Sequence, residues 1–341
     1  MTVKNIAVIG SGYFSQFHYA AWQRIEGINI TGMYTLDAAS GDALCQQFAI
    51  PERYNSLQQL IDSKPDLVDV IVPPDAQQAL LHPLADHTIG CICQKPFCSD
   101  LQQAEQTVAY FGERNTPLVI HENFRHQPWY RAIKRYLDEK RLGEIYQITY
   151  RLRPGDGQGA DAYLERQPYF REQTEFLVRE TAVHFIDVFR YLCGEISGVF
   201  ADLVKLNPVI RGEDAGMIMI RFANGARGLI DGNRLSDHAS VNPRLTMGEM
   251  SIEGAKGELT LDGLGQVFFR LHGEQNGQPV PFEFNNNDFG GDCVYLTQKH
   301  IIDCLNSGKE PENTAKAYLL NRYWERQVYN SSAEGRWKTN S

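Results

Sequence analysis

The sequence lacks the features that would place the protein in a membrane, outside the cell or on nucleic acid. No apolar run in its 341 residues approaches the length of a membrane-spanning helix. The first predicted strand starts at Val3, which leaves no room for a signal peptide. The formal net charge of −9 argues against a nucleic-acid partner. We therefore expect a cytoplasmic protein that acts on a small-molecule substrate.

The cysteines form no framework for disulfides or metal. There are seven, an odd number, and no C-x-x-C pair occurs. Cys91 and Cys93 share one face of a predicted strand, and Cys98 follows shortly after. This pattern predicts buried thiols in a reducing cytoplasm and no zinc or other metal site.

The sequence also lacks an internal repeat and a low-complexity linker. Its hydrophobic content of 43% and charged content of 22% are globular values. A chain of this length exceeds one typical core, so we expect two domains, residues 1–122 and residues 123–341.

The first fifteen residues carry the strongest local signal. A Val- and Ile-rich strand runs into Gly10-Ser11-Gly12, and residues 14–25 follow with a helical pattern. A strand, a glycine turn and a helix N-terminus form the phosphate cradle of a dinucleotide fold. Gly10 permits the tight turn and Gly12 lets the backbone approach a pyrophosphate. The cofactor turn is predicted to comprise Gly10, Gly12, Tyr13, Phe14 and Ser15, with the small Ser15 in place of the third glycine.

The cofactor can be NAD or NADP. A ribose-binding acid is expected about twenty residues past the glycine turn. Thr35 occupies that place at the end of a strand over 28–36, and Asp37 comes two residues later. Thr35 and Ser40 could leave room for a 2′-phosphate, but no arginine stands beside them, which favours NAD.

The rest of the chain divides by pattern. Strands over 66–72, 91–93 and 118–121 alternate with helices over 42–48, 57–61, 76–86 and 101–112. Alternation of this kind predicts a doubly wound parallel sheet, a Rossmann domain. Beyond residue 122, helices over 128–141, 176–192, 295–305 and 315–329 flank seven predicted strands. These predict an α+β domain with an open, largely antiparallel sheet.

Several short motifs, in order and spacing, resemble the Gfo/Idh/MocA superfamily, the glucose–fructose oxidoreductase and inositol dehydrogenase group. The match runs nearly end to end. The motifs are Val72-Pro73-Pro74-Asp75, Gln94-Lys95-Pro96, Asn123-Phe124-Arg125, and Glu180 with His184 and Asp187 in one helix.

The resemblance implies an NAD(P)-dependent oxidoreductase. Such an enzyme transfers a hydride between nicotinamide and a hydroxyl-bearing carbon of a sugar, polyol or sugar-acid-like substrate. It implies that Lys95 and His184 face the reacting hydroxyl, with Glu180 one turn before the histidine. It also implies further cofactor contacts from Thr35, Asp37, Pro73, Pro74, Gln77, Gln94, Lys95 and Asn123.

The residue types suit that chemistry. Glu180 and His184 are four residues apart and so share a helix face. A lysine can act as a base when burial or a nearby cation lowers its pKa, and histidine needs no such tuning. A core histidine and a surface lysine are the structural alternatives.

Four positions depart from the family pattern. Gln94 replaces the acid before Lys95, Glu180 replaces aspartate, Ala182 replaces glycine, and Gln77 stands where histidine is frequent. These changes bear on the substrate and on activity, not on the fold.

The substrate is predicted from arginines and aromatic residues in the second domain. The candidate substrate residues are Arg125, Arg151, Arg179 and His238, with Arg153, Arg171, Arg234, Tyr163 and Tyr169 in the same segments. Inward-facing arginines would suit a carboxylate or phosphate, whereas the family's usual sugars and polyols are the default.

Two other functions fit the same sequence: a nucleotide-binding regulatory protein, and an enzyme that uses NAD to hydrolyse a glycosidic bond. An open sheet leaves one face to be covered, and the family covers it by pairing sheets between subunits. We therefore expect a homodimer or homotetramer.

Overall fold

The computed structural model describes residues 2–340 and divides the chain into two compact units. The first comprises Met1–Asn123 and Val294–Arg322, and the second comprises Phe124–Cys293 and Tyr323–Ser341. The division differs from a single boundary after residue 122, because residues 294–322 return to the first unit. Each unit is described on its own below.

The first unit contains a six-stranded sheet in the order β3-β2-β1-β4-β5-β6, with every neighbouring pair parallel. This is the doubly wound sheet that the sequence predicts. The strands are β1 (Asn5–Ile9), β2 (Asn29–Tyr34), β3 (Arg53–Tyr54), β4 (Leu67–Val70), β5 (Gly90–Gln94) and β6 (Leu118–His121).

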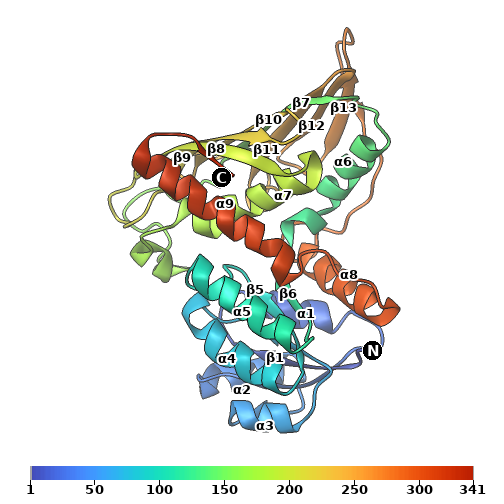
Figure 1. The fold of residues 1–341 in the computed structure, drawn as a ribbon, viewed down its shortest axis with the longest axis vertical. Helices are drawn as coiled ribbons and strands as arrows, with labels where there is room; N and C mark the ends of the chain where they lie inside the picture. Colours follow the sequence, from blue (N-terminus) through green and yellow to red (C-terminus); the bar gives the residue numbers. More distant parts are fainter. Residues whose placement is uncertain (1, 341) are drawn as a thin grey trace. The chain divides into compact units, whose positions relative to one another are not determined.

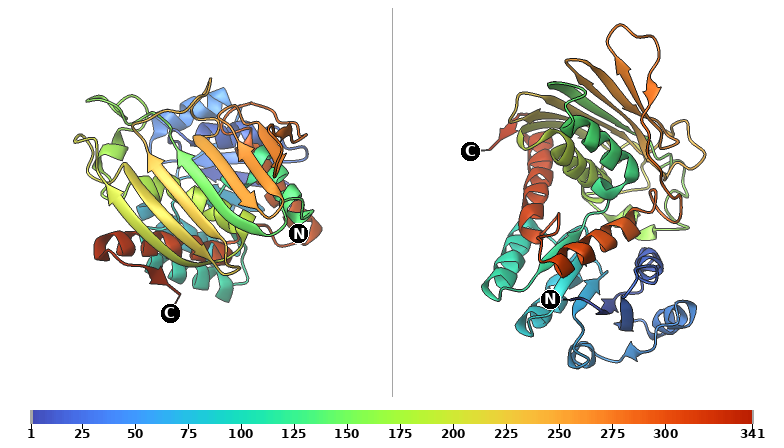
Figure 2. Two further views of the ribbon diagram at one scale, coloured as in Figure 1. Left: turned by 90° about the horizontal axis from the view of Figure 1, so that it is seen from above. Right: turned by 90° about the vertical axis from the view of Figure 1, so that its right-hand side faces the viewer.

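Helices cover both faces of the parallel sheet, as Figure 2 (right) shows. They are α1 (Ser15–Trp22), α2 (Ala38–Gln47), α3 (Leu57–Asp62), α4 (Pro74–Asp86) and α5 (Leu101–Glu113). The central strands β4 and β5 are buried at every position and are mostly apolar, although β4 includes Asp69 and β5 ends in Gln94.

Helix α8 (Cys293–Ser307) completes the core of the first unit. Its Ile301 and Ile302 pack in one cluster with Val8, Tyr19 and Trp22 from β1 and α1. The sequence predicts this helix but not its core, since an apolar helix face does not specify which core it joins.

The second unit is built on a nine-stranded sheet in the order β14-β13-β12-β11-β7-β10-β9-β8-β15. Every neighbouring pair is antiparallel except β7 with β10. The strands are β7 (Ile145–Leu152), β8 (Ile196–Val204), β9 (Ala215–Phe222), β10 (Arg227–Asn233), β11 (Gly248–Gly254), β12 (Gly257–Leu261), β13 (Val267–Leu271), β14 (Gln278–Pro279) and β15 (Lys338–Thr339).

Helices of the same unit cover one face of this sheet (Figure 1). They are α6 (Pro128–Asp138), α7 (Val183–Cys193) and the later part of α9 (Ala315–Glu334), with short 3-10 turns at Phe124–His126 and Pro168–Glu172. Strand β7 alternates, so Ile148, Tyr150 and Leu152 face the core. The ring of Tyr150 stacks on Phe185 of α7, with ring centroids 3.7 Å apart.

The other face of the sheet is open, and Figure 2 (left) looks directly onto it. One row across the strands pairs Phe200 with Met219, Met219 with Leu229, and Leu229 with Thr149. Met219 is 42% exposed and its strand neighbour Met217 is 57% exposed.

One local feature departs from the predicted helix over 176–192. Residues Leu177–Ala182 form a π-helix, and the α-helix begins only at Val183. The π-helix is rare and often occurs at functional sites. Glu180 and His184 therefore lie on opposite sides of a π–α junction, and the simple α-helical spacing does not describe them.

Candidate functional site

The glycine turn after β1 is closely packed against the chain. Gly10 has φ +120°, and a Cβ there would lie 2.1 Å from the carbonyl oxygen of Ile71. Its amide donates to the oxygen of Tyr34 and its carbonyl accepts from the Tyr19 hydroxyl. No other residue type fits at position 10.

Gly12 differs from Gly10, because a Cβ at position 12 would meet no protein atom within 4 Å. Space beside this backbone is therefore open. Ser15 is fully buried, and its hydroxyl donates to the Gly12 oxygen over 2.7 Å. Helix α1 then begins without a side-chain cap, and the amides of Ser15 and Phe17 donate to the oxygens of Gly12 and Phe14.

Thr35 and Asp37 lie in the loop between β2 and α2. The hydroxyls of Thr35 and Ser11 lie 2.8 Å apart, which links the loop to the glycine turn. The Asp37 carboxylate caps α2 by accepting from the amides of Ala39 and Ser40. Hydrogen bonds from Ser40 lower the pKa of Asp37, which keeps an acceptor charge at this exposed position.

The turn after β5, which carries Lys95, is held by two buried glutamines. The Gln77 amide donates to the oxygens of Gln94 and Pro96 and accepts from the Cys98 amide. The Gln94 side chain accepts from the Lys95 amide over 2.7 Å. The Lys95–Pro96 peptide bond is cis. Pro73 caps α4 and Pro74 opens it, while Asn123 is buried at the end of the first unit.

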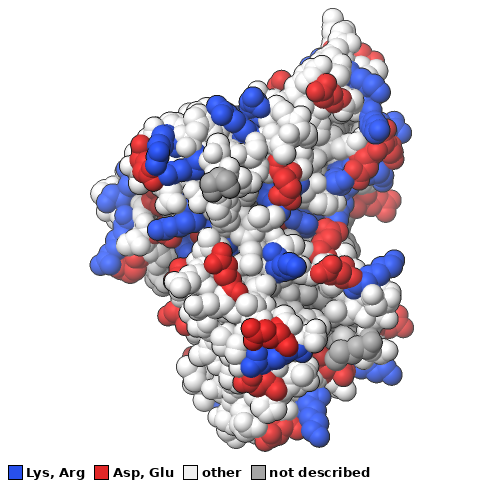
Figure 3. All heavy atoms as spheres, viewed as in Figure 1, with Lys and Arg blue, Asp and Glu red and all other residues white. Residues whose placement is uncertain are grey.

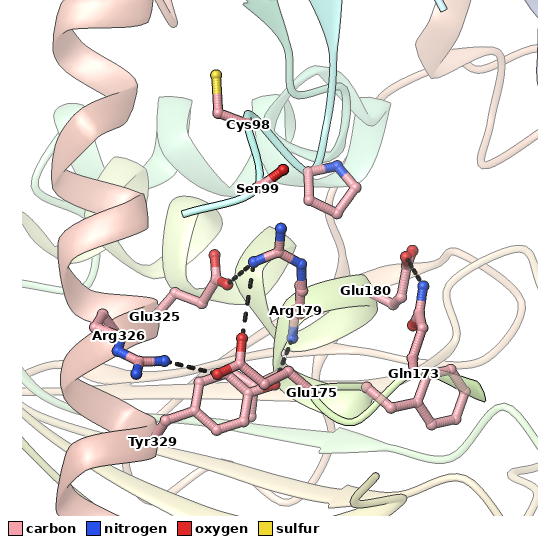
Figure 4. Close-up of polar contacts among 12 residues, drawn as sticks. Cys98, Ser99, Gln173, Glu175, Arg179, Glu180, Glu325, Arg326 and Tyr329 are labelled. Atoms are coloured by element: carbon pink, nitrogen blue, oxygen red, sulfur yellow. Dashed lines mark hydrogen bonds and ion pairs between the residues drawn. The ribbon is translucent and has the colours of Figure 1, made fainter. Parts of the chain in front are cut away.

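In the second unit, the π-helix carries Glu180. This side chain is 9% exposed and accepts from the Gln173 amide over 2.8 Å. Figure 4 shows the two side chains directed toward each other. The contact holds the carboxylate in one orientation.

The start of the π-helix is fastened by a residue from a distant loop. The Glu213 carboxylate accepts from the amides of Phe176 and Val178. The Tyr329 hydroxyl of α9 donates to Glu213 over 2.7 Å and accepts from the Arg179 amide. Burial raises the pKa of Glu213, and the hydrogen bond from Tyr329 opposes that rise.

His184 lies at the first turn of α7, 6% exposed. The ring of Phe124 stacks on it with centroids 3.8 Å apart and planes 4° from parallel. The neighbouring Arg125 makes a bidentate ion pair with buried Asp187, with both N–O distances 2.7 Å. Phe124 and Arg125 thus both contact the helix that carries His184.

The arginines proposed to hold a substrate are already paired with groups of the chain. Arg151 pairs with Glu249, Arg153 with Asp231 and Arg234 with Asp156. Arg179 lies between Glu175 and Glu325 (Figure 4). Arg171 donates instead to the backbone oxygens of Ala160 and Ala162.

Arg234 is the most buried of these arginines, with 2% exposure. It also donates to Tyr163 and Thr181, and its guanidinium lies over the ring of Phe176. Burial alone would lower the pKa of Arg234, but the Asp156 carboxylate raises that pKa by more than burial lowers it. The guanidinium therefore keeps its charge. Burial raises the pKa of Tyr163 to about 12, which keeps its hydroxyl protonated. This cluster anchors the loop after β7.

His238 lies in the loop after β10, with one ring nitrogen 2.7 Å from the Arg153 oxygen and the other 3.2 Å from the Thr246 hydroxyl. Tyr169 is 53% exposed on the short 3-10 turn. Residues 2–340 contain no cluster of three potential ligands that could hold a metal. In the same range no helix is long and apolar enough to cross a membrane.

Sequence reasoning missed the groups that support the site from a distance. Three such residues each contact a predicted site segment from more than thirty residues away in the sequence: Glu213 contacts Val178, Asp156 contacts Arg234, and His18 contacts Gln94. Tyr329 ends the predicted helix over 315–329, and the sequence assigns its hydroxyl no role. No local pattern marks such residues, because their partners are set by the tertiary fold.

Comparison with known families gives two matches. Residues 4–121 match an oxidoreductase family with an NAD-binding Rossmann fold, named GFO_IDH_MocA. Residues 130–260 match the GFO/IDH/MocA C-terminal domain.

Curated relatives cover almost the whole chain. A D-apiose dehydrogenase of Paraburkholderia graminis is 28% identical, over 98% of this chain and 90% of that protein. One of Rhizobium rhizogenes is also 28% identical, over 98% and 97%. An oxidoreductase of Agrobacterium radiobacter, solved with NAD⁺, L-tartaric acid and magnesium, is 26% identical over 99% of this chain and 98% of that one, with a TM-score of 0.90.

Proposed function

We propose that this chain, which belongs to the Gfo/Idh/MocA family of NAD-dependent oxidoreductases, oxidises a secondary or hemiacetal hydroxyl of a neutral sugar. The dehydrogenase reaction type and the nicotinamide cofactor follow from the family. The substrate class and the residue roles are our proposal.

The choice of a neutral substrate rests on the ion pairs between the candidate arginines and carboxylates of the chain. A substrate carboxylate or phosphate needs a guanidinium that is not already neutralised. Arg125, Arg151, Arg153, Arg179 and Arg234 each have a carboxylate partner within the chain. Displacing a buried partner such as Asp187 would leave a charge without compensation. A neutral sugar, bound through hydrogen bonds, imposes no such cost.

The residues of the first unit fit the nicotinamide dinucleotide. The open space beside Gly12 and the uncapped start of α1 suit a pyrophosphate. Asp37 presents an exposed carboxylate after β2 that suits ribose hydroxyls, which favours NAD over NADP. When bound, the dinucleotide supplies the hydride acceptor.

The chain's own part in the reaction is to handle the hydroxyl proton. As the hydroxyl carbon loses a hydride, its oxygen loses a proton, which Lys95 or His184 accepts. Glu180 sets the charge beside the histidine helix. Phe124 fixes the plane of the His184 ring by stacking on it. Gln94 and Gln77 fix the backbone that carries Lys95.

The test is a substrate panel followed by the absorbance of NADH. D-apiose, myo-inositol and levoglucosan represent the named relatives, and L-tartrate represents an acid. We expect turnover of a neutral sugar and none of tartrate. Turnover of tartrate alone would overturn the neutral-sugar assignment, and failure to bind NAD(H) or NADP(H) in calorimetry would remove the enzyme assignment.

The exposed sheet face and the free cysteines bear on the oligomeric state and the compartment of the protein. We infer a homodimer or homotetramer formed through the open sheet face, on which Met217, Met219 and Val204 are large, apolar and exposed. The seven free cysteines suit a reducing compartment such as the cytoplasm.

A further inference from the structure

A buried chain of polar side chains leads from β4 to the lysine turn. Asp69 of β4 is fully buried, and its Oδ2 lies 2.8 Å from His18 Nδ1. The same oxygen accepts from Trp22 Nε1 over 2.7 Å. His18 Nε2 lies 3.0 Å from Gln94 Nε2, and Gln94 Oε1 accepts from the Lys95 amide. All five residues belong to the first unit.

The direction of each hydrogen bond follows from one fixed donor. The Lys95 amide can only donate, so the atom of Gln94 that faces it is the oxygen. The nitrogen of Gln94 therefore faces His18 and donates to Nε2, which must be unprotonated. Nδ1 then carries the proton and donates to Asp69, because an ionised carboxylate can only accept. Only this assignment of donors and acceptors satisfies every hydrogen bond along this series of side chains.

We propose that Asp69, His18 and Gln94 are positioning residues that hold the Lys95 backbone, with His18 locked as the neutral Nδ1–H tautomer. The proposal rests on the proposed role of Lys95. Gln77 holds the same turn at the oxygens of Gln94 and Pro96 and at the Cys98 amide. Four backbone groups of this short turn are thus fixed by buried side chains, namely the oxygens of Gln94 and Pro96 and the amides of Lys95 and Cys98.

The glutamine at position 94 is what permits a neutral histidine. A carboxylate at that position has no proton to donate to His18 Nε2. In Gln94→Glu, the contact is kept only if Nε2 is also protonated, which makes His18 an imidazolium between two carboxylates. The ring of His121 in β6 also faces that of His18, with ring centroids 4.1 Å apart. The residue that departs from the family pattern therefore sets the protonation state of its neighbour.

The first experiment reads the tautomer directly, without any substrate. Protein labelled at the histidine nitrogens is examined by long-range proton–nitrogen correlation, with His18→Gln to assign the signal. We expect a protonated Nδ1 and an unprotonated Nε2 near neutral pH, and two protonated nitrogens in Gln94→Glu. An Nε2–H tautomer or an imidazolium in the wild type would overturn the proposal.

The second experiment tests positioning. His18→Leu should lower kcat by about tenfold or more, since a misplacement of ~1 Å can cost about 10²-fold, while KM and the NAD affinity change by less than about threefold. His87→Leu, at the exposed end of α4, is the control. Unchanged kcat in folded His18→Leu would refute the positioning role. A wild type that oxidises no sugar would instead refute the proposed function and leave the tautomer result standing.

Discussion

The Tyr329 hydroxyl is expected to stabilise the π-helix that carries Glu180, and Tyr329→Phe removes only that hydroxyl. Above the folded pKa of Glu213, the change deletes a hydrogen bond to a buried carboxylate, worth about 1.5–3 kcal/mol, and it also removes the Tyr329 oxygen as an acceptor for the Arg179 amide, at about 1–3 kcal/mol. We expect a loss of about 3–5 kcal/mol in the free energy of unfolding. For a unit of this size, that corresponds to a fall of roughly 6–20 °C in Tm.

The same variant should show a defined pH dependence. Burial raises the pKa of Glu213 above its ordinary value, so protonation favours the folded state, and the stability from this group is lost as pH rises through the folded pKa. Without the Tyr329 hydrogen bond the pKa of Glu213 rises further. The destabilisation of Tyr329→Phe should therefore be full above the folded pKa and shrink as pH falls.

Chemical denaturation at several pH values measures both effects. Tyr323→Phe is the matched control, because it lies on the same helix and its hydroxyl has no hydrogen-bond partner within residues 2–340. If Tyr329→Phe loses no more stability than this control at any pH, the Tyr329 hydroxyl does not stabilise the π-helix.

Three further predictions test other parts of the site. Gly12→Ala should keep the wild-type Tm but bind NAD at least about tenfold more weakly. Gly10→Ala should fail to fold stably, because only a Cβ at position 10 collides with the chain. Equal changes of Tm in the two variants would contradict this prediction. Asp37→Asn should weaken NAD binding and reduce the ratio of the affinity for NAD to that for NADP, both measured by calorimetry. An unchanged ratio would show that Asp37 does not bind the ribose hydroxyls. Light scattering at micromolar protein should give a dimer or tetramer that Met219→Asp shifts toward monomer, and a monomeric wild type would exclude pairing through the open face.

The elements that the sequence predicts well are those whose cause is local. The Gly10 turn follows from the strand before it and the helix after it, and the buried β4 and β5 follow from their largely apolar sequences. The two-residue strand β3 was missed because two residues carry no periodicity.

Other features depend on partners far along the chain. The π-helix at Leu177–Ala182 is stabilised by Glu213, whose side chain reaches amides at 176 and 178. The arginines were predicted as possible anion ligands because a sequence does not show that Asp156 or Asp187 already neutralises them. The tautomer of His18 likewise depends on Asp69 and Gln94, which the fold brings together.

The most direct test of the proposed mechanism is the rate of NADH formation with the best sugar of the panel, compared among wild type, Lys95→Ala and His184→Ala. Loss of a general base typically costs about 10²–10⁴ in rate. We predict that each variant loses kcat by such a factor while its affinity for NAD stays near that of the wild type. Near-normal kcat in both variants, on a sugar that the wild type clearly oxidises, would show that neither residue accepts the hydroxyl proton.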